Sequence, residues 1–415
     1  MAGDKRVWVV NKSDKDFERT DIDLKKHIIL KPFIPMEMPF SIGMKYLNFK
    51  GISLVANIEQ YFRERKMKQL VIRNAGIGDL LLLEPIIRQL AINGKREMTM
   101  LTGFPEVFDY NPYVKKSIRM INRDTIPSDV KFNQFDCYED LRFWSETCPD
   151  RDKKHRTDCY NQKFNIKIDD PEPRLYLSRG EPFAFEKKDG FRYIGICCDG
   201  SHEYRRYDYG VELSQYILKQ DKKNIVVILG AWNFVPPQNS DRIIDLQGKT
   251  AVDDVFDVIR KLDAVVSVDT GLMHVALAMH IPTVALFSII TPELRLSNYR
   301  GPYEAIYKKE LPCIGCGNFH MAVCKHGDKK KNKDFVPPCL QITPTEIYER
   351  IEKLPREFTP RLFFSGEIPV SAPAVISPAQ KITLPIIVLN EEKNLPRFIE
   401  LVMKHPAIGR VVAID

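Results

Sequence analysis

A short polar segment directly after a predicted strand has the residue types of a phosphate or sugar site. Val265–Val268 is a β-branched apolar run, typical of a strand buried on both faces. Asp269, Thr270 and Gly271 follow it, and His274 lies in the first turn of a predicted helix. Backbone N–H groups at a helix N-terminus bind phosphate oxygens. Helix capping by Asp269 and Thr270 explains the same residues without a ligand.

Two further segments carry residues suited to group transfer. Gly76 and Gly78 form a turn after the predicted strand Gln69–Arg73, and Asp79 opens an apolar helix. A carboxylate there is either a general base or a helix N-cap. Arg205 and Arg206 follow a third predicted strand and add local positive charge, close in sequence to Lys187 and Lys188.

Four cysteines are grouped near the end of the predicted core region. Their spacing, one C-x2-C pair followed by two more cysteines, predicts a structural zinc site with His320 and His326 as spare ligands. Reduced thiols and disulfides are the alternatives. Four thiolates leave no open position for a substrate, so no catalytic metal is expected there. The four residues are Cys313, Cys316, Cys324 and Cys339.

Composition indicates a protein of several globular domains. The chain has 415 residues, a hydrophobic share of 44%, a charged share of 28% and a formal net charge of +7. It has no apolar run long enough for a membrane span and no signal-peptide core at its start, which predicts a cytoplasmic location. The basic loop Lys325–Lys333 is either solvated or faces an anionic acceptor or membrane surface.

Strands that alternate with helices predict an α/β fold with two Rossmann-like domains facing a cleft. A helix is expected near 52–66, whereas 136–170 is polar and has no clear pattern. The expected divisions are an N-terminal extension at 1–66, a first Rossmann-like domain at 67–185, a second with the cysteine cluster at 186–353, a linker at 354–380, and a truncated βαβ fragment at 381–415.

The segment Leu70–Pro85 resembles the first strand, loop and helix of the heptosyltransferase-type glycosyltransferases (glycosyltransferase family nine, GT-B fold). Asp269–His274 resembles that family's sugar-nucleotide loop, and Asp245–Thr250 a short turn that precedes it. The resemblance implies an inverting glycosyltransferase with a nucleotide-diphosphate sugar as donor, no catalytic metal, and a glycan or lipopolysaccharide-type acceptor. It also implies that the first domain lies on the acceptor side and that the second binds the nucleotide sugar.

The same resemblance implies roles for single residues. Asp79 would be the catalytic base, and Gly76 and Gly78 would belong to the acceptor-side loop. Asp269 would bind hydroxyls of the donor sugar, and His274 would assist there. The diphosphate would be held by Thr270, Gly271 and one of the two arginines, Arg205 or Arg206, in a position where the family usually has lysine.

The end of the chain has a separate resemblance. Leu384–Pro396 is similar to the opening of a family-two, GT-A glycosyltransferase, but the metal-binding motif of that fold is missing, so an inactive fragment is expected. Two other functions remain open for the whole chain. One is transfer to modified bases in DNA, as in phages, and the other is a non-catalytic sugar-nucleotide-binding or scaffold protein.

Overall fold

The computed structural model describes most of the chain between residues 67 and 365. The described residues are 67–94, 96–122, 124–180, 183, 185–200, 202–231, 241–317, 324–328, 331–332 and 334–365, together with the backbone of strands β1–β5, β18 and β19.

The first half of this region is built on a parallel four-stranded sheet with the order β8-β7-β6-β9. The central strands β6 and β7 are largely buried, the outer strands β8 and β9 are more exposed, and α3 is buried along most of its length. The strands are β6 (Lys68–Arg73), β7 (Glu97–Thr102), β8 (Val114–Arg119) and β9 (Cys137–Asp140), and the helices are α3 (Ile77–Gly94), α4 (Trp144–Thr147) and α5 (Arg156–Phe164).

The second half contains a parallel six-stranded sheet with the order β13-β12-β11-β14-β15-β16. Its strands are β11 (Arg192–Cys197), β12 (Asn224–Ile228), β13 (Ile243–Asp245), β14 (Ala264–Val268), β15 (Thr283–Leu286) and β16 (Tyr303–Ile306). Its helices are α6 (Gly210–Gln220), α7 (Val252–Ile259), α8 (Gly271–Ala278), α9 (Glu293–Leu296) and α10 (Pro344–Lys353). The predicted pair of Rossmann-like folds is therefore confirmed.

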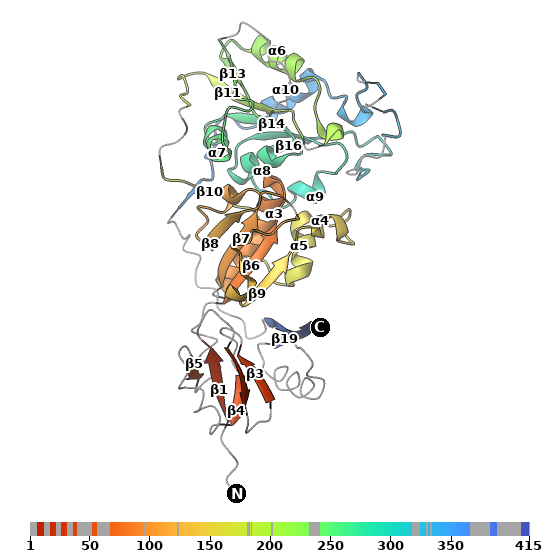
Figure 1. The fold of residues 1–415 in the computed structure, drawn as a ribbon. Coiled ribbons are helices and arrows are strands. Elements are labelled where there is room, and N and C mark those ends of the chain that lie inside the picture. Colours follow the sequence, from red (N-terminus) through yellow and green to blue (C-terminus); the bar gives the residue numbers. More distant parts are fainter. Residues whose placement is uncertain are drawn as a thin grey trace.

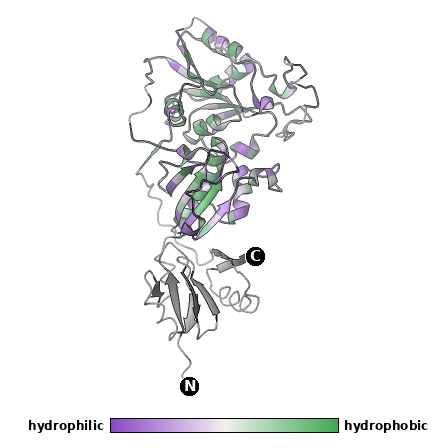
Figure 2. Ribbon diagram, in the orientation of Figure 1, coloured by the Kyte–Doolittle hydropathy of each residue, from purple (hydrophilic) through white to green (hydrophobic). Residues whose placement is uncertain are grey.

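The two halves pack directly on each other through α3 and α8 (Figure 1). Leu81 from the first half and Met273 from the second belong to one hydrophobic core. Figure 2 shows the hydrophobic residues concentrated in the central strands and in the helices between the sheets. This packing brings the N-terminal ends of α3 and α8 together, which positions the site described below.

A second connection joins the halves away from these helix ends. Strand β10 (Tyr176–Leu177) pairs in parallel with β17 (Phe363–Phe364), so residues near 363 return to the segment that joins the two sheets. Glu172 in that segment is buried, accepts from the ring Nε2 of His280 at 2.8 Å and forms an ion pair with Nη1 of Arg361 at 2.6 Å. These contacts link the connecting segment to the second half.

The described strands outside this region form small sheets. Near the start they are β1 (Arg6–Asn11), β2 (Phe17–Asp21), β3 (Lys26–Leu30), β4 (Met36–Pro39) and β5 (Ile52–Val55). The expectation of a helix from residue 52 is wrong for Ile52–Val55, which pairs antiparallel with β1 as its β-branched content favours. Near the end, β18 (Ile382–Ile387) and β19 (Ile408–Ile414) pair in parallel. The helix expected between them lies outside the described residues.

Candidate active site

The strand order explains why residues from distant segments meet. In the second sheet the order reverses between the adjacent strands β11 and β14, where Cys197 pairs with Ser267. The loops that follow these two strands diverge and leave a crevice, which is where open α/β sheets bind ligands. Arg205 lies after β11 and Asp269 after β14. The first sheet has the same arrangement between β6 and β9, so its crevice contains Asp79.

Both crevices open into one cavity of about 480 Å³ between the two halves. The first half contributes Gly76, Ile77, Gly78, Asp79, Leu82, Phe104, Ser145, Glu146, Arg151, Asp152 and Arg156, and the second contributes Arg205, Asp269, Thr270, Gly271, Leu272, His274 and Arg295. The structure therefore places all the predicted site residues at one cavity except Arg206 and the cysteines.

Asp79 is held between two arginines. Its carboxylate lies 3.2 Å from Nη2 of Arg73 and 3.4 Å from Nε of Arg156. Burial alone would raise the pKa of Asp79, but Arg156 and Arg73 outweigh that effect and hold the pKa well below its usual range. Asp79 is the third residue of α3 and lies within the helix, so it does not occupy the N-cap position.

Asp269 is a buried carboxylate at the start of α8. Its Oδ2 lies 3.1 Å from Nη2 of Arg205, and its Oδ1 lies 3.7 Å from Nε2 of His274. Burial would raise the pKa of Asp269, but the Arg205 guanidinium and His274 lower it well below its usual range. Thr270 occupies the N-cap position of α8 without a side-chain capping hydrogen bond. Helix capping by its hydroxyl therefore does not explain why a threonine occupies position 270.

Arg205 and Arg206 have different surroundings, although the sequence left the choice between them open. Arg205 is largely buried, lines the cavity and also donates to the backbone carbonyl of Asp269. Arg206 pairs with Asp199 at 3.1 Å and its side chain is 53% exposed. Arg205 is therefore the arginine that can meet a ligand in the cavity.

Two small residues allow the helix ends to approach each other. A Cβ added at Gly78 would lie 2.5 Å from Cδ2 of His274, and one added at Gly271 would lie 2.8 Å from Cβ of Ile77. The His274 ring is buried and fixed by a 2.9 Å hydrogen bond between Nδ1 and the hydroxyl of Tyr299. Gly78 and Gly271 thus set the width of the cavity.

Gly78→Ala should lower the free energy of unfolding by about 1–3 kcal/mol, because overpacking at this contact forces the two halves apart. Gly76→Ala is the matched control, since a Cβ there meets no atom within 4 Å. We expect Gly76→Ala to be neutral or slightly stabilising. Thermal and denaturant unfolding of both variants measures the difference, and equal losses would contradict the close contact.

Sequence reasoning missed three arginines that shape the site. Arg73 ends β6 and donates to Oγ of Ser145 at 2.6 Å as well as to Asp79. Arg156 begins α5, within the stretch for which no pattern was apparent. Arg295 lies in the short helix α9. A buried carboxylate needs a positively charged partner, so the sequence could have indicated that arginines or lysines lie near Asp79 and Asp269. It could not have indicated which ones.

The described residues give no support to the zinc site expected at the cysteine cluster. The nine cysteines of the chain are free thiols. In the described part of the chain, no group of three or more His, Cys, Asp or Glu side chains is arranged to hold a metal ion. Cys313 Sγ lies 3.3 Å from Nε2 of His326, whereas Cys316 is exposed. Burial and the neighbouring thiols raise the pKa of Cys339 to about 12. His320 lies outside the described residues.

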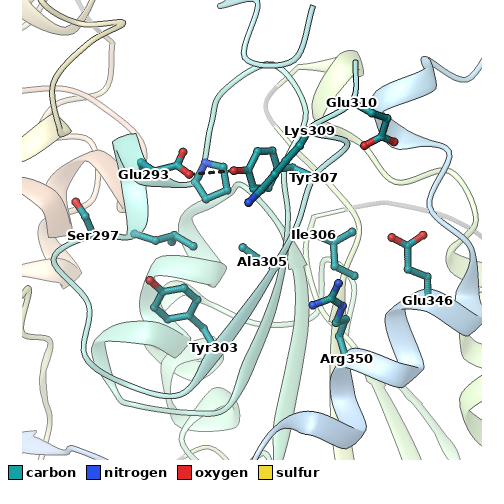
Figure 3. Close-up of a pocket in the computed structure, with 12 residues that line it drawn as sticks. Glu293, Ser297, Tyr303, Ala305, Ile306, Tyr307, Lys309, Glu310, Glu346 and Arg350 are labelled. Carbon is teal, nitrogen blue, oxygen red and sulfur yellow. Dashed lines mark hydrogen bonds between the residues drawn. The ribbon is translucent and has the colours of Figure 1, made fainter. Parts of the chain in front are cut away.

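A second hollow, of about 540 Å³, lies beside the edge strand β16 (Figure 3). Tyr303, Ala305 and Ile306 of β16 line it, with Glu346 and Arg350 from α10. The Tyr307 hydroxyl donates to Glu293 Oε1 at 3.0 Å at its rim. None of the residues that the sequence singled out lines this hollow.

Residues 228–317 match the model of glycosyltransferase family 9 (heptosyltransferase). Over this segment the chain is similar to that family. The resemblance inferred from the motifs is thereby confirmed over this range, which includes Asp269, Thr270, Gly271, His274 and Arg295, whereas Asp79 and Arg205 precede it. The implied enzyme class, a glycosyltransferase, agrees with this family.

Over 120 residues the chain is 36% identical to lipooligosaccharide heptosyltransferase 2 of Haemophilus influenzae. The match covers 29% of this chain and 32% of that relative, so the chain spans about a third of the relative's length. This relative is named as a heptosyltransferase, the type of enzyme that the family model describes.

Solved structures share the fold over a longer range. E. coli ADP-heptose lps heptosyltransferase II superposes with a TM-score of 0.50 and 17% identity, covering 69% of this chain and 98% of that one. The iron-containing dodecameric glycosyltransferase TibC of enterotoxigenic E. coli gives a TM-score of 0.52 at 14% identity, covering 84% and 92%. At these identities the likeness concerns the fold, which is the GT-B arrangement expected from the sequence.

No helix among the described residues is long and apolar enough to cross a membrane.

Proposed function

We propose that the chain is an inverting glycosyltransferase that moves a sugar from a nucleotide-diphosphate sugar to an acceptor hydroxyl. One observation carries the proposal. Asp79 from the first half and the Asp269–Gly271 segment from the second line the same cavity. A carboxylate opposite a phosphate-binding helix end is the arrangement that a single displacement at a sugar carbon requires.

The second half would bind the donor. The N-terminus of α8 presents the backbone N–H groups of Thr270 and Gly271, and Arg205 adds a positive charge. Asp269 would accept hydrogen bonds from donor-sugar hydroxyls. The solved structure of TibC includes a complex with ADP-D-beta-D-heptose. A nucleotide-activated heptose is therefore the first donor to test.

The transfer is a single displacement. The acceptor oxygen forms a bond to the anomeric carbon while the bond from that carbon to the phosphate oxygen breaks. The acceptor proton passes to Asp79, and the electron pair of the broken bond leaves with the nucleoside diphosphate. Arg205 and the N-terminus of α8 would stabilise the charge that develops on the diphosphate. The anomeric carbon is inverted because attack and departure occur on opposite sides.

Asp79 is a weak base in this setting, since Arg73 and Arg156 keep it ionised. A weak base suffices for this reaction. The acceptor hydroxyl becomes strongly acidic only as its oxygen bonds to the anomeric carbon, so the proton is lost late. Asp79 would first orient the hydroxyl as a hydrogen-bond acceptor and then receive the proton.

The proposed acceptor is a glycan of the lipopolysaccharide type, in line with the names of the relatives above. The alternative of modified bases in DNA finds no support in these comparisons. The non-catalytic alternative shares the donor site and differs only in the absence of transfer.

A thermal-shift screen of nucleotide sugars tests the donor class. A ligand that binds only the native state at 100 times its Kd adds about 2.7 kcal/mol of stability. We expect ADP-heptose or another nucleotide-diphosphate sugar to raise the Tm by several degrees, with release of the nucleoside diphosphate when acceptor is added. Binding without release would favour the non-catalytic alternative. No Tm rise with any nucleotide sugar would contradict the proposed function.

A further inference from the structure

Arg295 is a buried cation in the cavity without a carboxylate partner. It lies in α9, its residue is only 5% exposed, and it lines the cavity with Asp79 and Asp269. Its Nη1 donates to the backbone carbonyl of Leu294 at 3.0 Å. Across the described part of the chain, no carboxylate oxygen lies within 4.0 Å of its guanidinium nitrogens, the limit for an ion pair.

The other guanidinium groups near the cavity centre are already paired. Arg73 and Arg156 contact Asp79, and Arg205 contacts Asp269. Four guanidinium groups therefore surround two carboxylates, and Arg295 is the one left without a close carboxylate. Among the other residues that line the cavity, Arg151 pairs with Asp152, and Glu146 accepts from the Ser145 hydroxyl.

The surroundings of Arg295 are electrostatically unfavourable while the cavity holds no anion. Burial and the nearby Arg156 lower the pKa of Arg295 to about 10, while Asp269 and Asp79 act in the opposite direction. The guanidinium thus remains charged at neutral pH. A desolvated cation beside two other guanidinium groups is stabilised by an anion placed among them.

We propose that Arg295 binds the diphosphate of the donor together with Arg205 and the N-terminus of α8. This inference rests on the proposed function and assigns a further cation to the leaving group. Both arginines line the same cavity as Thr270 and Gly271, beside which the diphosphate would lie. Arg295 lines the same cavity as Asp79 and Asp269, so we assign it to the β-phosphate, the phosphate next to the reacting carbon.

Arg295→Met separates a binding role from a structural one. A buried charge without a partner destabilises the ligand-free protein, so an apolar side chain of similar length should leave its Tm unchanged or raise it. A diphosphate loses a charge-assisted hydrogen-bond partner in the same variant. Arg295→Lys keeps the charge without the planar fork, and we expect it to restore part of the affinity.

The experiment is a calorimetric titration of the full chain with ADP, UDP, AMP and UMP. For each diphosphate that binds wild type, we expect Arg295→Met to lower the affinity about 10- to 100-fold. We expect it to lower the affinity for the monophosphates less than about 3-fold. Arg350→Met is the matched control. Arg350 lines the hollow of Figure 3 and pairs with Glu304 at 2.8 Å, so its loss should leave nucleotide affinity unchanged.

The outcomes distinguish the two proposals. If wild type binds neither diphosphate and no nucleotide sugar raises its Tm, the proposed function fails. If wild type binds a diphosphate and Arg295→Met binds it equally well, only the role of Arg295 fails. A marked fall in the Tm of ligand-free Arg295→Met would show a structural role and overturn the inference. Unchanged diphosphate affinity with a raised KM for an anionic acceptor would assign Arg295 to the acceptor and also overturn it.

Discussion

Asp79→Asn should reduce sugar transfer by about 10²- to 10⁴-fold while donor binding survives. The amide cannot receive the acceptor proton, and general-base catalysis contributes rate factors of that size. The side chain keeps its shape, and the proposed donor contacts lie on the other wall of the cavity, at Asp269 and Arg205. Initial rates of nucleoside diphosphate release, with donor affinity from calorimetry, measure both effects.

Asp158→Asn is the matched control for this change. Asp158 is the third residue of α5, as Asp79 is the third residue of α3, but its side chain is exposed. We expect Asp158→Asn to retain transfer. Asp79→Asn also leaves Arg73 and Arg156 without their carboxylate, so its Tm should fall. Retained donor binding shows that the variant is folded, and full turnover in a folded variant would remove Asp79 from the role of base.

Arg205→Gln should weaken nucleoside diphosphate binding about 10- to 100-fold, because it removes a charge-assisted contact from a largely buried site. Transfer should fall at least as much, since the charge on the leaving diphosphate increases in the transition state. Calorimetry with ADP and UDP gives the affinities, and nucleoside diphosphate release gives the rates.

Arg206→Gln is the matched control, because the sequence did not decide which of the two neighbouring arginines binds the diphosphate. Arg206 is half exposed and pairs with Asp199 outside the cavity, so we expect its loss to change affinity by less than about twofold. Equal losses in the two variants, or a larger loss in Arg206→Gln, would contradict the placement of Arg205 as the diphosphate ligand.

The local parts of the site could be predicted from the sequence. Asp79 and Asp269 each follow an apolar strand and open a helix, and this pattern lies within a few neighbouring residues. Strands that alternate with helices also predicted the two parallel sheets. Such features depend on local periodicity and on the rule that ligands bind at the carboxyl ends of parallel strands.

The long-range parts could not be predicted in the same way. Arg156 and Arg295 reach the cavity from short helices that have no strong periodicity, and their roles depend on how the two halves pack. The choice between Arg205 and Arg206 depends on the turn that follows β11, where one side chain points toward Asp269 and the other pairs with Asp199. The zinc prediction rested on cysteine spacing alone, which does not determine how the four thiols are arranged in space.

A crystal structure with an unreactive nucleotide-diphosphate sugar tests the central claim most directly. The account predicts the diphosphate at the N-terminus of α8, in contact with Arg205 and Arg295, and the anomeric carbon facing Asp79. A donor bound elsewhere, for instance in the hollow beside β16, or a sugar turned away from Asp79 would contradict it.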